Sequence, residues 1–216
     1  MAANVAQRRS KKAARRKAVL AEKRKAAALD NSVAARIRRA VAGPIHHCKQ
    51  HADLFDAGMG VLTMVRGTPG ETVLCAFWLD VFYLGIKDVQ IRSLTMSEAD
   101  FFLGALEEAA PLKEVEPAYA RKLLRDLAAW VEPIGFLPPR DFAVAERIFG
   151  DANPEACDSV FRFGKDGKPC YVPDLSESSA EKLRRVEQLR QRLGDGGFDI
   201  LIEDENPEPS QSSRSA

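Results

Sequence analysis

The chain has 216 residues, 45% of them hydrophobic, and its formal net charge at pH 7 is only +1. This length leaves room for one ordinary domain of roughly 160 residues between a polar start and a polar end. The longest apolar run, Val73 to Ile86, contains Asp80 and is shorter than the about 20 apolar residues that cross a bilayer. We therefore predict a single hydrophobic core, no membrane span and no cofactor.

The charge is divided unevenly along the chain. Residues 1–40 hold 13 Lys or Arg against two acids, Glu22 and Asp30, a net charge of +11 that leaves −10 for the rest. A basic arm on an acidic body indicates a polyanionic partner, or an arm that folds back on the body. No aromatic residues are interleaved with these bases, so we expect phosphate contacts with little reading of bases.

The arm predicts binding of RNA, DNA or a ribonucleoprotein surface. The same pattern also fits a solubilising tail or a nuclear-import signal, whereas the scarcity of large apolar residues disfavours a mitochondrial presequence. The predicted nucleic-acid-binding residues are Arg8, Arg9, Lys11, Lys12, Arg15, Arg16, Lys17, Lys23, Arg24 and Lys25.

Three regions are expected along the chain. The arm, residues 1–40, is predicted to be a frayed helix or disordered through Leu29, followed by a short basic helix that Asn31 or Ser32 caps. One domain is predicted over residues 44–202, because Gly43 and Pro44 end the arm. The acidic and Ser-rich residues 203–216 are predicted to be disordered.

The body predicts antiparallel hairpins. Residues 60–66 form a short strand-like run, residues 68–70 have turn chemistry, and residues 72–89 form a long run rich in Val and aromatic residues, with a bend at Gly85. A second hairpin is predicted from residues 160–163 and 169–172, with Asp166-Gly167 as its turn.

Helices are predicted between and after these hairpins. One begins at Ser97, and a second carries Tyr119, Leu123, Leu127 and Trp130 on one face because these residues recur at helical spacing. A third runs from residue 141 to 149 and a fourth from 178 to 193, before a short strand at 198–202. Antiparallel hairpins with intervening helices predict an α+β fold.

An acid inside the most apolar run is the main candidate for chemistry. Burying a carboxylate without a partner costs several kcal/mol, so Asp80 requires a partner or a purpose. Asp80, Lys87 and Asp88 are weak catalytic candidates for a metal-dependent nuclease or phosphoryl-transfer enzyme. The alternative is that Asp80 accepts backbone or Lys87 hydrogen bonds and shapes the bend at Gly85.

The three histidines fall within six residues, as His46, His47 and His51. His47 and His51 would share a helical face and are weak candidates for a metal site, but a third or fourth ligand is missing and we predict no metal. The four cysteines form no CxxC pair, which is typical of reduced thiols in the cytoplasm.

Several segments are similar to a group of uncharacterised bacterial proteins. They are the run FWLDVFYLGIKDV at 77–89 and shorter matches at 118–124, 134–136, 147–151 and 161–169. The resemblance covers about Pro44 to Val172 and includes a basic N-terminal tail, but not the histidine cluster. It implies a bacterial cytoplasmic protein and a shared domain, without an activity or a catalytic residue.

Three functions remain open from the sequence. The leading prediction is a noncatalytic protein that binds nucleic acid or a ribonucleoprotein through its arm. The second is the metal-dependent enzyme centred on Asp80, Lys87 and Asp88. The third is a protein-interaction adaptor that uses the acidic body and the helix at 178–193.

Overall fold

The computed structural model describes residues 17, 20, 31–68, 70–173 and 177–201. Most of the predicted basic arm and the predicted acidic tail at 203–216 therefore lie outside the described residues. Among the described helices, none is both long and apolar enough to cross a membrane.

One antiparallel sheet of five strands organises the body, with the strand order β4-β3-β2-β1-β5. The apolar residues of its three longest strands face helices that pack on both sides of the sheet. The predicted α+β fold is thus confirmed. The strands are β1 (Ile45–His51), β2 (Met59–Thr68), β3 (Glu71–Asp80), β4 (Gly85–Leu94) and β5 (Leu112–Glu114).

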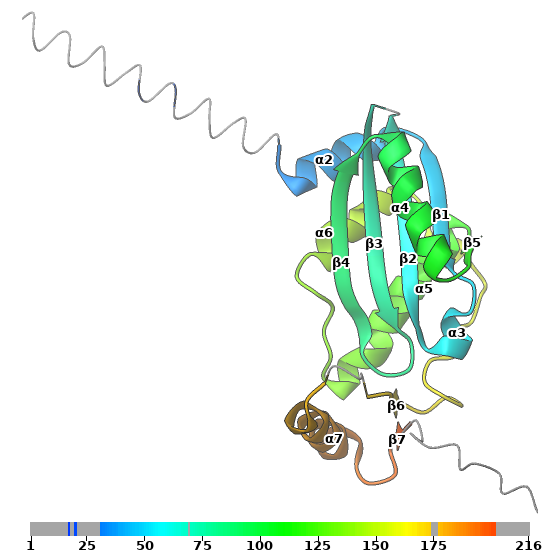
Figure 1. Ribbon diagram of the computed structural model, residues 1–216, viewed down its shortest axis with the longest axis vertical. Coiled ribbons are helices and arrows are strands. Elements are labelled where there is room, and N and C mark those ends of the chain that lie inside the picture. The colour runs from blue at the N-terminus through cyan, green and yellow to red at the C-terminus, as the bar shows by residue number, and fades with distance from the viewer. Residues whose placement is uncertain (1–16, 18–19, 21–30, 69, 174–176, 202–216) are drawn as a thin grey trace, which may run out of the picture.

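Helices cover the two faces of this sheet unequally (Figure 1). Helix α4 (Met96–Ala109) packs alone on one face through Ala99 and Leu103. The larger core lies on the opposite face, under α2 (Val33–Val41), α5 (Pro117–Val131) and α6 (Phe142–Ala145). Short helices α3 (Leu54–Ala57), η1 (Glu132–Ile134), η2 (Glu146–Phe149) and η3 (Pro154–Ala156) fill the connections.

The last elements form a small unit at one end of the sheet (Figure 1). Strand β6 (Cys170–Tyr171) pairs in parallel with β7 (Asp199–Ile200), and α7 (Ser179–Leu193) connects them. Tyr83 from the β3–β4 turn packs edge-on against Tyr171, with ring centroids 5.2 Å apart. Leu189 of α7 is completely buried beside this pair, which attaches the unit to the sheet.

The helix predictions are confirmed in place, except that α4 starts earlier and the predicted helix at 141–149 is the short α6 followed by the 3-10 helix η2. Helix α5 buries Leu123 and Leu127 as its spacing predicts, and α7 begins after Ser178, which forms a capping box with Glu181. Helix α4 starts at Met96, one residue before the predicted Ser97, because Thr95 is its cap and exchanges hydrogen bonds with Glu98.

The first predicted hairpin forms, since β2 pairs with β3 as far as Thr68 and Glu71, but the extent of its second arm and the second hairpin need correction. Residues 72–89 are not one strand: β3 and β4 pair with each other across the turn at 81–84. In the second hairpin the turn forms, with Lys165 bridged to Lys168, but residues 160–163 are not a strand and β6 pairs with β7 instead. The predicted strand at 198–202 is present as β7.

Helix α2 belongs to the body and not to the arm. Ser32 caps it, as predicted, by accepting a hydrogen bond from the backbone N–H of Ala35. Its residues Ile37 and Ala40 are buried in the main core. A domain boundary at residue 40 would therefore remove part of the core.

Candidate functional site

Exposed arginines of α2 continue the basic charge of residues 1–30 onto the folded surface. Arg38 is exposed, and Arg39 pairs with Glu71 at 2.8 Å. Arg36 donates from Nη1 to the Ser93 hydroxyl at 3.0 Å, which brings α2 next to β4 at the edge of the sheet. Both Arg38 and Arg39 lie in the last turn, where the helix dipole favours positive charge.

A further exposed cation lies on the same edge strand. Arg92 of β4 places its guanidinium carbon 5.0 Å from the centroid of the Phe102 ring. This contact holds the side chain over α4 while leaving the residue exposed. Arg36, Arg38 and Arg92 were not among the predicted binding residues, although the first two belong to the 13 bases counted at the start of the chain.

Of the ten predicted nucleic-acid-binding residues, the structure describes Lys17, which is helical and exposed. The other nine, from Arg8 to Lys25, lie outside the described residues.

Two other arginines, the buried Arg66 and the partly buried Arg121, are structural cations instead. Arg66 donates to the carbonyl oxygens of Gly43, Ile148 and Phe149 at 3.0, 3.3 and 3.2 Å. Arg121 pairs with Glu146 at 2.8 Å and donates to the carbonyl oxygens of Gly150 and Ala152. Arg66 satisfies main-chain acceptors after α2 and within η2, and Arg121 satisfies acceptors that follow η2, so neither is available to a phosphate.

Asp80 is bound to its own turn. Its Oδ1 accepts hydrogen bonds from the backbone N–H groups of Phe82 at 3.0 Å and Tyr83 at 2.9 Å. Burial raises the pKa of Asp80 to about 6, while these amides and the nearby charge of Lys87 act in the opposite direction. These contacts are those of the alternative prediction, in which the Asp80 carboxylate accepts backbone hydrogen bonds and shapes the bend at Gly85.

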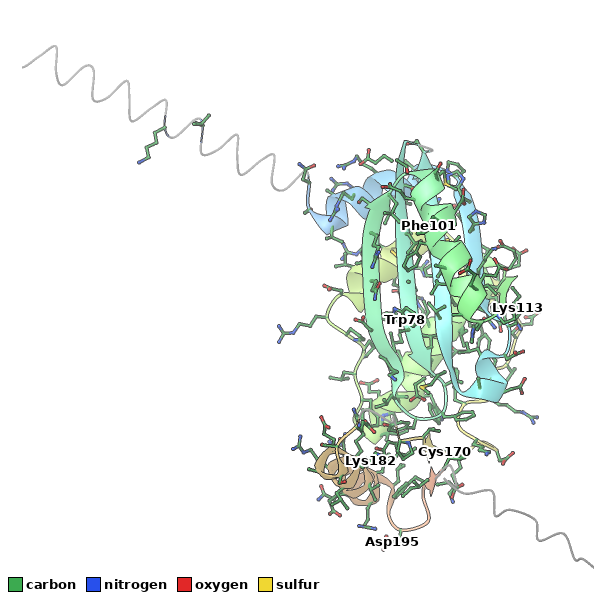
Figure 2. All side chains as sticks on the ribbon, viewed as in Figure 1. Trp78, Phe101, Lys113, Cys170, Lys182 and Asp195 are labelled. Atoms are coloured by element: carbon green, nitrogen blue, oxygen red, sulfur yellow. The ribbon has the colours of Figure 1, made fainter. Side chains whose placement is uncertain are left out.

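Lys87 and Asp88 lie on the surface, whereas Asp80 is buried. Both are exposed on β4, at an irregularity in its pairing with β3, and the Lys87 ammonium lies 3.7 Å from the sulfur of Met59. They border an open hollow of about 550 Å³ that Asp80 does not line. Trp78 also lines this hollow and lies on the part of the sheet beside α4 (Figure 2).

No group of three or more His, Cys, Asp or Glu side chains in the described part of the chain could hold a metal ion. Among the residues described, Asp80 therefore belongs to no such cluster.

The histidines lie on a strand and not on a helix. His47 and His51 belong to β1, so the expected shared helical face does not exist. His47 lies between two carboxylates, 3.3 Å from Asp100 and 3.4 Å from Glu114. His46 forms a hydrogen bond with the Gly67 carbonyl oxygen at 2.8 Å, so two of the three rings have structural contacts.

The buried cysteines are unsuited to nucleophilic chemistry. Burial raises the pKa of the Cys48 thiol to about 12, reinforced by the charges of Glu114 and Glu116, and burial also raises that of Cys75 to about 12. Both thiols therefore stay protonated at neutral pH.

No protein-family model matches the chain, and neither a curated protein nor a solved structure matches it. The chain is defined by its own structure as an α+β protein with a five-stranded antiparallel sheet and arginines exposed along one edge.

Proposed function

We propose that the protein is a noncatalytic nucleic-acid-binding protein that contacts phosphates through residues 1–30 and through α2. The observation that supports this most is the separation of charge, +11 in residues 1–40 against −10 in the rest. That basic segment leads directly into a helix that is anchored in the core and exposes Arg38.

The packing of α2 against the core lowers the conformational entropy that its arginines lose on binding. Because Ile37 is completely buried, the α2 backbone is already ordered before any partner arrives. Its arginines therefore lose less conformational freedom on binding than residues of an unfolded segment do. The body carries net negative charge, so it repels phosphates elsewhere and favours contact at this end.

RNA, DNA and ribonucleoprotein surfaces all present the required phosphates. The basic residues are interleaved with Ala and lack the aromatic side chains on which bases stack. The proposed mode is therefore contact with the phosphate backbone, which depends on salt and discriminates weakly among sequences.

Fluorescence anisotropy of labelled RNA and DNA tests the proposal. The full chain is compared with a full-length variant in which the ten predicted binding bases are replaced by Gln, at about 50 and 200 mM salt. The full chain is expected to bind with an affinity that falls at least about 100-fold over this range, because each phosphate contact releases a counterion. The Gln variant should bind far more weakly and with a shallow salt dependence.

The truncation that accompanies this experiment should start at residue 31. Residues 31–216 keep the Ser32 cap and the buried residues of α2, whereas a chain starting at residue 41 loses them. Full-length protein that fails to bind either nucleic acid, or binding that is insensitive to salt and to the ten substitutions, would refute the proposal.

A further inference from the structure

Residues 158–163 form an extended segment that pairs with no strand. The segment follows η3 and is bounded by two backbone hydrogen bonds, from Cys157 N–H to the Pro154 carbonyl and from Gly164 N–H to the Val81 carbonyl. Between these, within the described residues, no backbone N–H or carbonyl of 158–163 takes part in a hydrogen bond. In Figure 1 the segment belongs to the yellow chain on the side of the molecule that carries α3.

The side chains of this segment alternate as they do in a strand. Phe161 and Phe163 point inward, where Phe161 packs against Tyr119 and Phe163 against Trp130, with ring centroids 5.0 and 5.5 Å apart. Asp158, Val160 and Arg162 are exposed. The inward residues hold the backbone in place, so the segment is extended before any partner binds.

The edges of the segment are open. Two hollows of about 360 and 480 Å³ adjoin it, both lined by Tyr119 and Ser159, so open space lies beside the segment at these places. Val160 is 88% exposed, more than any other large apolar side chain described. An extended backbone with unused hydrogen-bonding groups and an exposed valine is a template for strand pairing.

We propose that this segment pairs with the same segment of a second copy of the chain. In an antiparallel pair with a two-fold axis at Val160, each Val160 lies opposite its counterpart. Asp158 of each copy then lies opposite Arg162 of the other, because both are two residues from the axis. Neither residue forms an ion pair within the described structure, so two cross-strand pairs would form in the dimer.

Self-complementarity is what selects a second copy over another protein. An unrelated extended peptide would gain the same main-chain hydrogen bonds, but it would need an acid and a base at the same spacing to match these charges. Because Asp158 and Arg162 are equally spaced about Val160, a second copy of the same chain provides this match. The inference does not depend on the proposed nucleic-acid binding.

Sedimentation equilibrium of the nucleic-acid-free full chain tests the proposal through charge reversal. The wild type is expected to show a concentration-dependent equilibrium between monomer and dimer. In the dimer, each of these single substitutions, Asp158→Arg or Arg162→Asp, places like charges opposite one another at both cross-strand positions. Each should therefore raise the dimer dissociation constant by about tenfold or more. The double variant D158R/R162D restores opposite charges and should return to within about threefold of the wild type.

Glu108→Arg is the matched control, because Glu108 is exposed on α4 and the same charge is reversed far from the segment in sequence. It should leave the dimer unchanged. Thermal unfolding should be similar for all variants, since the substituted side chains are exposed. A wild type that stays monomeric at every concentration, including one that instead captures extended peptides, overturns the proposal. So does a dimer that ignores both reversals or that the double variant fails to restore.

Discussion

The carboxylate of Asp80 accepts a hydrogen bond from the backbone N–H of Tyr83 at 2.9 Å, and this contact closes the turn between β3 and β4. The same oxygen accepts from Phe82 at 3.0 Å. The turn then ends at Gly85, whose φ of +77° lies in the left-handed region that glycine adopts without strain. Asp80 and Gly85 thus allow the chain to turn between β3 and β4, although the residues between them are apolar.

The buried position of Asp80 predicts a measurable pH dependence. Burial raises the pKa of Asp80 from 3.8 to about 6 in the folded state. The folded state therefore binds this proton more tightly than the unfolded state, so the stabilisation is complete below about pH 4 and is lost as the pH rises through 6. Relative to Asp80→Asn, the wild type should lose on the order of 3 kcal/mol of unfolding free energy between pH 4 and 7.

Urea denaturation of both proteins across this pH range measures the difference. Asparagine keeps a carbonyl acceptor for the turn amides but does not titrate, so the variant isolates the proton. Asp88→Asn serves as the control because Asp88 is exposed on the neighbouring strand. Parallel stability curves for wild type and Asp80→Asn would contradict the prediction.

The same turn explains why the strand order was only partly predictable. Residues 81–84 are Val, Phe, Tyr and Leu, and three of them are buried, so composition alone reads them as a continuation of the strand. The turn signal is Asp80 itself, whose polarity inside an apolar run allows both a catalytic interpretation and a structural one, in which its carboxylate shapes the bend at Gly85. Helix α5 was predictable from its apolar spacing and α7 from its cap at Ser178, because both signals are local in the sequence.

Long-range pairing was not predictable. The Asp166-Gly167 turn forms where expected, with positive φ at both residues, yet β6 pairs with β7, which follows α7. A turn determines where the chain reverses, but it does not determine which other strand pairs with β6. The basic surface was likewise predictable only in part. The basic residues could be counted from the sequence, but the contacts of Arg36 with Ser93 and of Arg92 with Phe102 depend on the tertiary fold.

Two glycine-to-alanine substitutions should have opposite effects on stability. A Cβ at Gly85 would lie 2.7 Å from Cγ2 of Val131 and would require an unfavourable positive φ, so Gly85→Ala should lower the unfolding free energy by about 2 kcal/mol or more. Gly104 is exposed in α4 with no atom near its added Cβ, so Gly104→Ala should raise it by about 1 kcal/mol. Denaturant unfolding of the two variants checks the contrast, and equal effects would refute it.

Removing the Arg66 guanidinium should destabilise the protein strongly. Its three carbonyl partners belong to the chain after α2 and to η2, so the side chain joins two segments that are distant in sequence. Arg66→Met leaves these acceptors without their donor and should cost about 3 kcal/mol. Arg38→Met, at an exposed position, should change stability by less than about 0.5 kcal/mol. Urea denaturation of both variants tests this, and a fully stable Arg66→Met protein would show that the contacts are dispensable.

Arg38 allows the contribution of α2 to nucleic-acid binding to be separated from that of residues 1–30. If its guanidinium contacts a phosphate, Arg38→Gln removes one released counterion, and the slope of log affinity against log salt should become shallower by about 0.9 on duplex DNA. Arg184→Gln makes the same change on α7, at the opposite end of the molecule from α2 (Figure 1), and should leave the slope unaltered. Anisotropy titrations at several salt concentrations measure both slopes. Identical slopes for Arg38→Gln and the wild type would restrict the proposed interface to the residues that precede α2.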